Sequence, residues 1–110
     1  MVKGIRFKIK TPDETIIHTT EDYWQRIVTT KHPSIAKYER QIKEALKDPD
    51  EIRRSQQDER VYLYYKSIGK LHVCAVVDRV TSKEGYIITA YLTDRIKEGE
   101  QIYVKTKNVL

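Results

Sequence analysis

The chain has 110 residues, of which 39% are hydrophobic and 34% are charged. This length allows one domain with one hydrophobic core, and the composition is typical of a globular protein with a wet surface. No apolar run approaches the length of a membrane span, and the first ten residues lack the apolar region of a signal peptide. Cys74 is the only cysteine, which excludes an internal disulfide and the common structural zinc sites and fits a cytoplasmic setting.

The net charge is +5 at neutral pH, and both signs are spread along the chain. A basic balance suits an anionic partner such as RNA, although many basic proteins bind no nucleic acid. Charge alone therefore leaves a nucleic-acid partner as one option among several.

Residues 1–20 are predicted to form an N-terminal β-hairpin. In the segment IRFKIK, apolar and basic residues alternate, as in a strand with one buried face. Pro12 lies in the turn sequence TPDE, and TIIHT can return as the second strand. We interpret the row of basic side chains as a solvated face.

Residues 21–48 are predicted to form two helices. Thr19 or Thr20 can cap the first helix. Pro33 fits the first turn of the second helix, and Pro49 ends it. The apolar residues of the second helix fall on one face at helical spacing: Ile35, Tyr38, Ile42, Ala45 and Leu46.

Residues 51–105 are predicted to form an antiparallel sheet, because the apolar period changes there from that of a helix to that of a strand. EIRRS is a short candidate strand, and VYLYYKSI, LHVCAVVDRV and YIITAYLT follow it with short turns, which favour antiparallel hairpins. The fold class that follows is α+β: an N-terminal β-hairpin, two helices, then an antiparallel meander sheet packed on the helices, in a single domain of residues 1–110.

Alternation divides the strand residues between two faces. We assign to the helices a core face made of Val61, Leu63, Tyr65, Leu71, Val73, Ala75, Val77, Tyr86, Ile88, Ala90 and Leu92. The opposite face then carries Tyr62, Tyr64, Lys66, His72, Cys74, Val76, Ile87, Thr89, Tyr91 and Thr93. Its rings can stack on bases and its hydroxyls can reach phosphate oxygens, as on a binding surface. Tyrosine and threonine are also good strand formers, so a sheet without a function stays open as the alternative.

Two adjacent arginines precede this sheet. If Ile52 points into the core from a regular strand, Arg53 points to the polar face and Arg54 shares the side of Ile52. A guanidinium matches a phosphate bidentately, and Lys66 could add a second cation. The alternative is that both arginines form ion pairs with Asp50, Glu51 and Asp58.

His32 stands before Pro33, at the start of the second predicted helix. The positive end of a helix disfavours the imidazolium, and a neutral imidazole can accept a proton near neutral pH. The position suits a general base, and the alternative is a capping histidine without chemistry. We interpret His18 and His72 as ordinary strand residues.

Four segments occur in an order that resembles a known family: KHPSIAKYERQIKEALKDPDEIRRS, VYLYYK, LHVCAVV and GYIITAYLTDRIKEGE. They resemble the phage-associated nucleases of the barnase–EndoU–colicin–RelE superfamily (the BECR, or RelE-like, fold) over roughly residues 27–100, with the hairpin outside. The resemblance implies a four-stranded antiparallel sheet packed on helices and a metal-independent ribonuclease, often a toxin or effector. The matching positions are His32, Arg53 or Arg54, Lys66, and Thr89 or Thr93.

The predicted activity is cleavage of RNA by attack of a ribose 2′-OH on the adjacent phosphorus, which yields a 2′,3′-cyclic phosphate and a 5′-OH. The predicted catalytic residues are His32 as acid or base, with Arg53, Arg54, Lys66 and Thr89 around the phosphate. The predicted substrate-binding residues are Tyr62, Tyr64, Tyr91 and Thr93. No metal and no cofactor is expected.

Two alternatives stay open. A non-catalytic module of the same fold would bind RNA or an acidic protein through the polar face and the basic hairpin. A purely structural or oligomerising domain is the other. The partners considered are RNA and a cognate inhibitor or antitoxin protein, with no membrane. The chain is compatible with a monomer, or with a dimer formed through an edge strand near the N-terminus.

Overall fold

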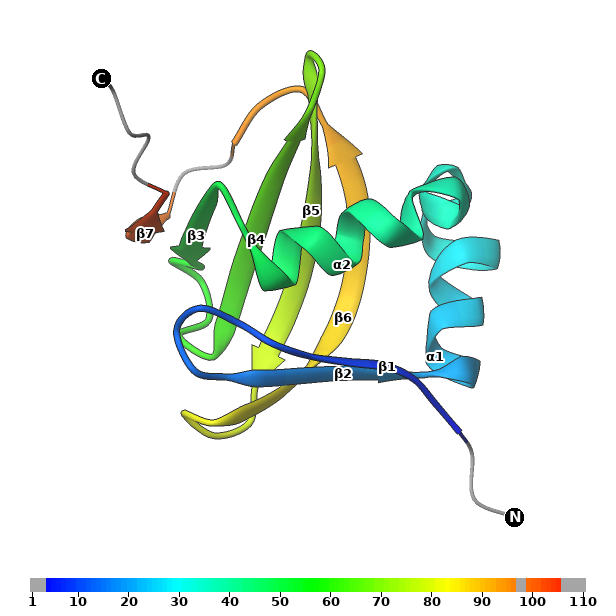
Figure 1. Cartoon of the computed structure of the whole chain (residues 1–110), viewed down its shortest axis with the longest axis horizontal. Coiled ribbons are helices and arrows are strands. Elements are labelled where there is room, and N and C mark those ends of the chain that lie inside the picture. The colour runs from blue at the N-terminus through cyan, green and yellow to red at the C-terminus, as the bar shows by residue number, and fades with distance from the viewer. Residues whose placement is uncertain (1–3, 97–98, 106–110) are drawn as a thin grey trace.

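The computed structural model describes residues 4–96 and 99–105. It has the α+β class that the sequence predicts, with an N-terminal hairpin, helical segments and a seven-stranded sheet in the order β1-β2-β6-β5-β4-β3-β7 (Figure 1). The strands are β1 (Ile5–Lys10), β2 (Ile16–Thr20), β3 (Glu51–Arg54), β4 (Val61–Ile68), β5 (Leu71–Arg79), β6 (Glu84–Thr93) and β7 (Glu100–Val104). The helical segments are α1 (Glu21–Arg26), the π-helical turn η1 (Ile27–Lys31), the 3-10 helix η2 (Pro33–Tyr38) and α2 (Glu39–Lys47). Within these described ranges, no helix has the length and hydropathy needed to cross a lipid bilayer.

The N-terminal hairpin forms as predicted, with β1 antiparallel to β2. β2 also pairs in parallel with the start of β6, which joins the hairpin to the meander in one mixed sheet and which the sequence pattern does not indicate. Gly85 lies at this junction. A Cβ atom there would come within 2.6 Å of the carbonyl oxygen of Asp78 and 3.2 Å of the side chain of Ile17. The close approach of β2, β6 and β5 therefore requires glycine at this position.

The region predicted as two helices is divided into four short segments. The hydroxyl of Thr20 accepts a 3.2 Å hydrogen bond from the backbone N–H of Tyr23, so Thr20 is the N-cap. Helix α1 changes into a π-helical turn at a run of β-branched residues, where Thr29 donates a 2.6 Å hydrogen bond to the carbonyl of Gln25. Pro33 then starts η2, in the first-turn position that the sequence predicts.

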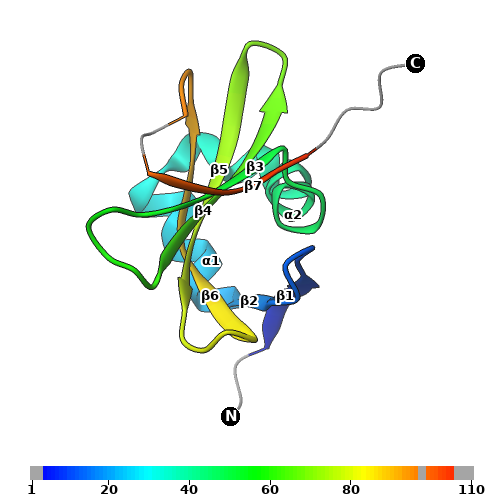
Figure 2. The same cartoon turned by 90° about the vertical axis from the view of Figure 1, so that its left-hand side faces the viewer.

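Helix α2 lies across one face of the sheet and α1 lies toward its β6 side (Figures 1 and 2), and together the helical segments bury the main core. The predicted apolar face of the second helix lies in this core. The buried core residues are Phe7, Ile17, Trp24, Ile27, Ile35, Ile42, Ala45, Leu46, Ile52, Tyr64, Val73, Ala75, Val77, Ile87 and Ala90. Burial of large apolar side chains contributes about 1.5–3 kcal/mol each, so this face supplies most of the stability. The opposite face of the sheet is called the open face.

The side chains of β4 point in the reverse of the predicted directions. Tyr62 and Tyr64 pack against the main core, whereas Leu63 and Tyr65 form a smaller cluster with Cys74 on the open face. Apolar and aromatic residues occupy both phases of this strand, so alternation by itself does not choose between them. The choice has to come from contacts with distant parts of the chain.

A bulge interrupts β6 at Ile88. Two neighbouring residues of β5 pair with Thr89 and Ile87, which leaves Ile88 without a partner on that strand. The side-chain alternation changes phase there, so Ile87 faces the core instead of the polar side, and Tyr86 lies on the open face instead of in the core. Beyond the bulge, the second half of the strand follows the prediction.

A polar cluster fixes the hairpin turn to β4 and β5. Asp13, from the turn, pairs with the guanidinium of Arg79 and accepts a 3.3 Å hydrogen bond from the hydroxyl of Tyr64. Arg79 donates a 2.9 Å hydrogen bond to the same hydroxyl, and its guanidinium lies 3.7 Å from the centre of the Tyr62 ring. Burial lowers the pKa of Arg79 and raises that of Tyr64. These contacts hold both tyrosines on the helix side, which explains the reversed phase of β4.

Removing the charge of Asp13 should destabilise the fold. Asp13→Asn leaves the partly buried Arg79 beside a neutral amide, and we expect the free energy of unfolding to fall by about 2 kcal/mol. A urea titration measures the loss as a lower midpoint. The matched control is Glu14→Gln in the same turn, because Glu14 forms an exposed pair with Lys10 whose loss should cost less than about 0.5 kcal/mol. Equal midpoints for the two variants would contradict the role of the cluster.

Arg6 joins the hairpin to the helical segments. Its Nε and Nη2 donate to the two carboxylate oxygens of Glu39 at 2.8 and 2.6 Å, and its Nη1 lies 2.9 Å from the carboxylate of Glu21. A bidentate contact of this kind is a strong form of ion pair. It holds the pKa of Glu39 below the usual value. The hairpin, α1 and α2 are thus tied together at one guanidinium.

The Glu39 pair should give the fold an acid-sensitive contribution. Because the pKa of Glu39 is lower in the folded than in the unfolded chain, this contribution is complete above the unfolded pKa and is lost as the pH falls through the folded one. The unfolding free energies of the wild-type protein and Glu39→Gln should therefore differ at neutral pH and converge in acid. Urea titrations at a series of pH values measure the difference, and a difference independent of pH would refute the expectation.

Candidate functional site

The open face carries rows of side chains from three neighbouring strands. The pairing of β4, β5 and β6 gives three successive rows: Ser67, His72 and Thr93, then Tyr65, Cys74 and Tyr91, then Leu63, Val76 and Thr89. Thr89, Tyr91 and Thr93 thus share this face with His72, as the alternation predicts. The hydroxyl of Thr93 donates a 2.9 Å hydrogen bond to the carbonyl of Arg95 and is used locally.

Two adjoining hollows form a groove on the open face. The first has a volume of about 350 Å³ and is lined by Ser55, Gln56, Gln57, Val61, Leu63, Val76, Thr89 and Tyr91. The second has a volume of about 370 Å³ and is lined by His32, Ser34, Thr89, Tyr91 and Leu92. Thr89 and Tyr91 line both hollows, which together are called the open-face groove. Figure 2 shows the loop between β3 and β4 projecting on the side of the sheet away from α2.

His32 reaches the groove from the junction between η1 and η2. Its backbone N–H donates a 2.8 Å hydrogen bond to the carbonyl of Ile27, which closes the π-helical turn, and Pro33 then redirects the chain. The centre of its ring lies 5.7 Å from that of Tyr91, with 53° between the ring planes. The imidazole makes no capping hydrogen bond to η2. The capping alternative therefore finds no support in the contacts of this side chain.

Tyr91 belongs to a polar cluster with Cys74 and Tyr65. Burial raises the pKa of Tyr91 above its usual value, and the neighbouring Cys74 thiol and Tyr65 hydroxyl raise it further. Tyr91 therefore stays protonated at physiological pH. In the groove it can donate a hydrogen bond or a proton, and it cannot serve as a base.

Thr89 has a buried hydroxyl with no hydrogen-bond partner among the described residues. A buried hydroxyl in this state costs about 1–3 kcal/mol, so most such groups in folded proteins are paired. Thr89 lies where the two hollows of the groove adjoin. A ligand oxygen held in the groove could accept the missing hydrogen bond.

The two arginines lie on opposite sides of β3, as the sequence predicts. Arg53 pairs in register with Leu63, whose side chain lines the open-face groove. Arg54 pairs with Tyr62, whose side chain lies on the helix side. The sheet thus presents one guanidinium of the adjacent pair to each face.

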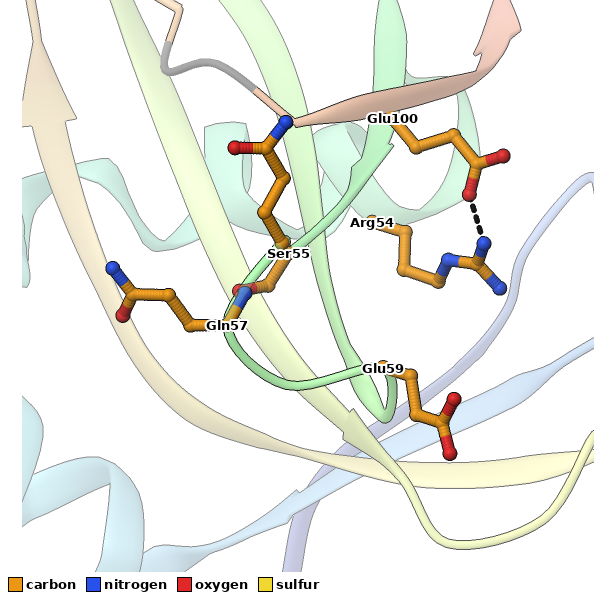
Figure 3. Close-up of a pocket in the computed structure, with 6 residues that line it drawn as sticks. Arg54, Ser55, Gln57, Glu59 and Glu100 are labelled. Atoms are coloured by element: carbon orange, nitrogen blue, oxygen red, sulfur yellow. Dashed lines mark hydrogen bonds and ion pairs between the residues drawn. The ribbon is translucent and has the colours of Figure 1, made fainter.

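Each arginine has a carboxylate partner. Arg53 forms an ion pair with Glu51, as the ion-pair alternative predicts, and donates a 3.3 Å hydrogen bond to the carbonyl of Gly99. Arg54 pairs with Glu100 of β7, beside a hollow of about 500 Å³ at the start of the β3–β4 loop (Figure 3). The partner of Arg54 comes from a distant strand, so the local sequence does not reveal it.

Lys66 does not reach the open face. Its Nζ donates a 2.9 Å hydrogen bond to the carbonyl of Asp48 and lies 3.6 Å from the carboxylate of Asp50. The prediction that Tyr62, Tyr64 and Lys66 lie on the polar face is wrong, because the reversed phase of β4 moves all three to the other side. A single phosphate site formed by both arginines and Lys66 is therefore not present.

Sequence reasoning overlooked several residues that line the groove. Ser34, Gln56 and Gln57 are polar, and they come from the segments that follow His32 and the arginine pair. Their position next to singled-out residues is a weak signal in the sequence. Their approach to one groove depends on how η2 and the β3–β4 loop flank the sheet.

No group of three or more His, Cys, Asp or Glu side chains in residues 4–96 and 99–105 is arranged to hold a metal ion. Comparison with protein-family models, curated proteins and solved structures finds no match for this chain. The resemblance to the BECR nucleases therefore stays a prediction, and the function has to be inferred from the geometry of the groove.

Replacing Thr89 by valine should stabilise the protein. Thr89→Val keeps the shape and removes a buried hydroxyl that has no partner among the described residues, so we expect the free energy of unfolding to rise by about 1 kcal/mol. The control is Thr20→Val, which removes the N-cap of α1. This variant should lower the free energy of unfolding by about 1 kcal/mol. Urea titrations measure both changes. A loss of stability in Thr89→Val would mean that this hydroxyl has a structural role.

Proposed function

We propose that this protein is an RNA endonuclease that works without a metal ion in the cytoplasm and uses the open-face groove as its active site. The observation that carries the proposal is the convergence of His32, Thr89 and Tyr91 on one groove. An imidazole, a hydroxyl with no partner in the described part of the chain and a protonated phenol are groups that move protons and orient a phosphate. The resemblance of residues 27–100 to the BECR nucleases supports the same reaction.

In the proposed mechanism His32 is the general base. Its imidazole takes the proton of a ribose 2′-OH, and that oxygen attacks the adjacent phosphorus. The bond from phosphorus to the 5′ oxygen breaks, and the leaving oxygen takes a proton from Tyr91. The products are a 2′,3′-cyclic phosphate and a 5′-OH. Thr89 donates a hydrogen bond to a nonbridging oxygen, and the proton on His32 returns to Tyr91 through solvent.

Arg53 is the proposed cationic contact for the phosphate. It lies on the open face beside Leu63, which lines the groove. A guanidinium has five N–H donors, and Glu51 and Gly99 each accept one from Arg53. The remaining donors can meet a nonbridging oxygen as charge develops on it. Arg54 has no part in this mechanism because it lies on the other side of β3.

RNA binding without cleavage is the second candidate function. The ion pair between Arg53 and Glu51 favours it, because a guanidinium that already faces a carboxylate stabilises developing phosphate charge less than a free one. A toxin-like role, with a cognate inhibitor or antitoxin protein, belongs to the first function. Toxicity of the expressed wild-type protein, absent in a His32→Ala variant, would therefore favour the endonuclease.

The purified protein should cleave total RNA in the presence of EDTA and leave 2′,3′-cyclic phosphate ends. Removing the proposed base in His32→Ala should lower the rate about 10²–10⁴-fold. Removing the cationic contact in Arg53→Ala should lower it about a hundredfold. Gel electrophoresis of a time course, with chemical analysis of the new ends, measures both effects.

Two control variants belong to this experiment. Arg54→Ala removes the same charge from the same strand but on the opposite face, and it should cleave at nearly the wild-type rate. His72→Ala removes an open-face imidazole outside the residues that line the groove, and it should also remain active. Equal losses in Arg53→Ala and Arg54→Ala would refute the assignment of the open face. Intact RNA that nevertheless shifts in a gel would favour the binding module.

A further inference from the structure

A small hollow lies at the fork where β2 separates from β6. The two strands pair only as far as His18 and Tyr86. Beyond this pair, a hollow of about 150 Å³ is lined by His18, Thr19, Thr20, Tyr23, Tyr86 and Ile87, and it is called the fork hollow. Neither the motifs of the sequence nor the proposed reaction accounts for it.

Three rings line the fork hollow. The centre of the Tyr86 ring lies 6.5 Å from that of His18 and 6.4 Å from that of Tyr23, and the two tyrosine rings meet edge to face. Proteins that bind single-stranded nucleic acid use such rings as stacking surfaces for bases. Thr19 also lines the hollow, and its hydroxyl is buried with no partner among the described residues.

Lys31 lies between the fork hollow and the open-face groove. Its Nζ donates hydrogen bonds of 3.3 Å to the hydroxyl of Tyr23 and 3.1 Å to the carbonyl of Ile88, and the next residue, His32, lines the groove. Both of these partners are uncharged. An ammonium has three N–H donors, so a third is left for an anion. The guanidinium of Arg26 lies 5.7 Å from the centre of the Tyr23 ring and adds a second positive charge near that ring.

We propose that the fork hollow is a nucleobase subsite of the RNA-binding surface and that Lys31 contacts the phosphate between this subsite and the groove. The inference rests on the proposed function in taking RNA as the ligand. The bulge puts Tyr86 on the same face as Thr89. The two residues are three positions apart on β6, a distance of about 10 Å that neighbouring nucleotides can bridge. The RNA strand then runs along β6, with one base in the fork hollow and the scissile phosphate beside His32.

Binding of a short, fluorescently labelled single-stranded RNA tests this subsite. The His32→Ala variant is the background, because it should bind RNA without cleaving it. On this background we measure the slope of log affinity against log salt concentration. Lys31→Ala should reduce the magnitude of this slope by about 0.7, the value for one phosphate contact on a single strand. The matched control is Lys37→Ala, an exposed lysine that also lies over a tyrosine ring, and its salt dependence should not change. Tyr23→Leu should weaken binding about tenfold through lost stacking.

The outcomes separate this inference from the proposed function. If the wild-type protein cleaves RNA but Lys31→Ala and Lys37→Ala have the same salt dependence, the fork hollow is not a subsite and the endonuclease stands. If RNA stays intact but binding depends on Lys31 and Tyr23, the subsite stands and the endonuclease is refuted. If Tyr23→Leu binds the RNA as tightly as the His32→Ala background and has the same thermal midpoint, the proposed stacking of a base on Tyr23 is refuted. Absence of any RNA binding overturns both proposals.

Discussion

One extra residue in β6, Ile88, has no partner on β5. The alternation of side chains between the two faces of the sheet therefore changes phase at this residue. Without this bulge, Tyr86 would face the helices, away from Thr89 and Tyr91. With it, Tyr86 of the fork hollow and the hydroxyls of the groove lie on one face, along one strand. The carbonyl of Ile88 is also the acceptor that holds Lys31 between them. The arrangement of β6 on the open face depends on this irregularity.

The phase of β4 depends on the polar cluster of Asp13, Tyr64 and Arg79. Asp13 and Arg79 hold the hydroxyl of Tyr64 and the ring of Tyr62 on the helix side, so Leu63 and Tyr65 line the opposite side. Because the period of a strand is two, a single fixed residue determines the direction of all the others. The hairpin thus has a role beyond its own strands, since its turn decides which side chains of β4 reach the groove.

Those parts of the fold that depend on local chemistry could be predicted. The capping hydroxyl of Thr20, the turn at Pro33 and the alternation of Thr89 with Tyr91 are read from a few neighbouring residues, and the structure has all three. The direction of Arg53 follows in the same way from the burial of Ile52. In each case a short stretch of sequence contains both the cause and the effect.

Other features depend on contacts between distant segments, and the sequence does not specify them locally. Both phases of β4 are apolar or aromatic, so the position of Lys66 could not be deduced without knowing where Asp13 lies. The parallel pairing of β2 with β6 creates the fork hollow, and no pattern within either strand indicates it. Lys31 appears in the sequence as one more lysine of a helix. Its place between two hollows becomes visible only when η1 packs beside β6.

Mapping the RNA contact on the folded protein would show whether the open face is the functional surface. The measurement is a titration of the His32→Ala variant with a short single-stranded RNA, followed by amide ¹H–¹⁵N chemical shifts. If the open face binds RNA, the largest shifts fall on Thr89, Tyr91 and the end of η1, while the shifts of Ala45 and Leu46 of α2 stay unchanged. Shifts confined to Arg54, Glu59 and Glu100, or none at saturating RNA, would contradict it.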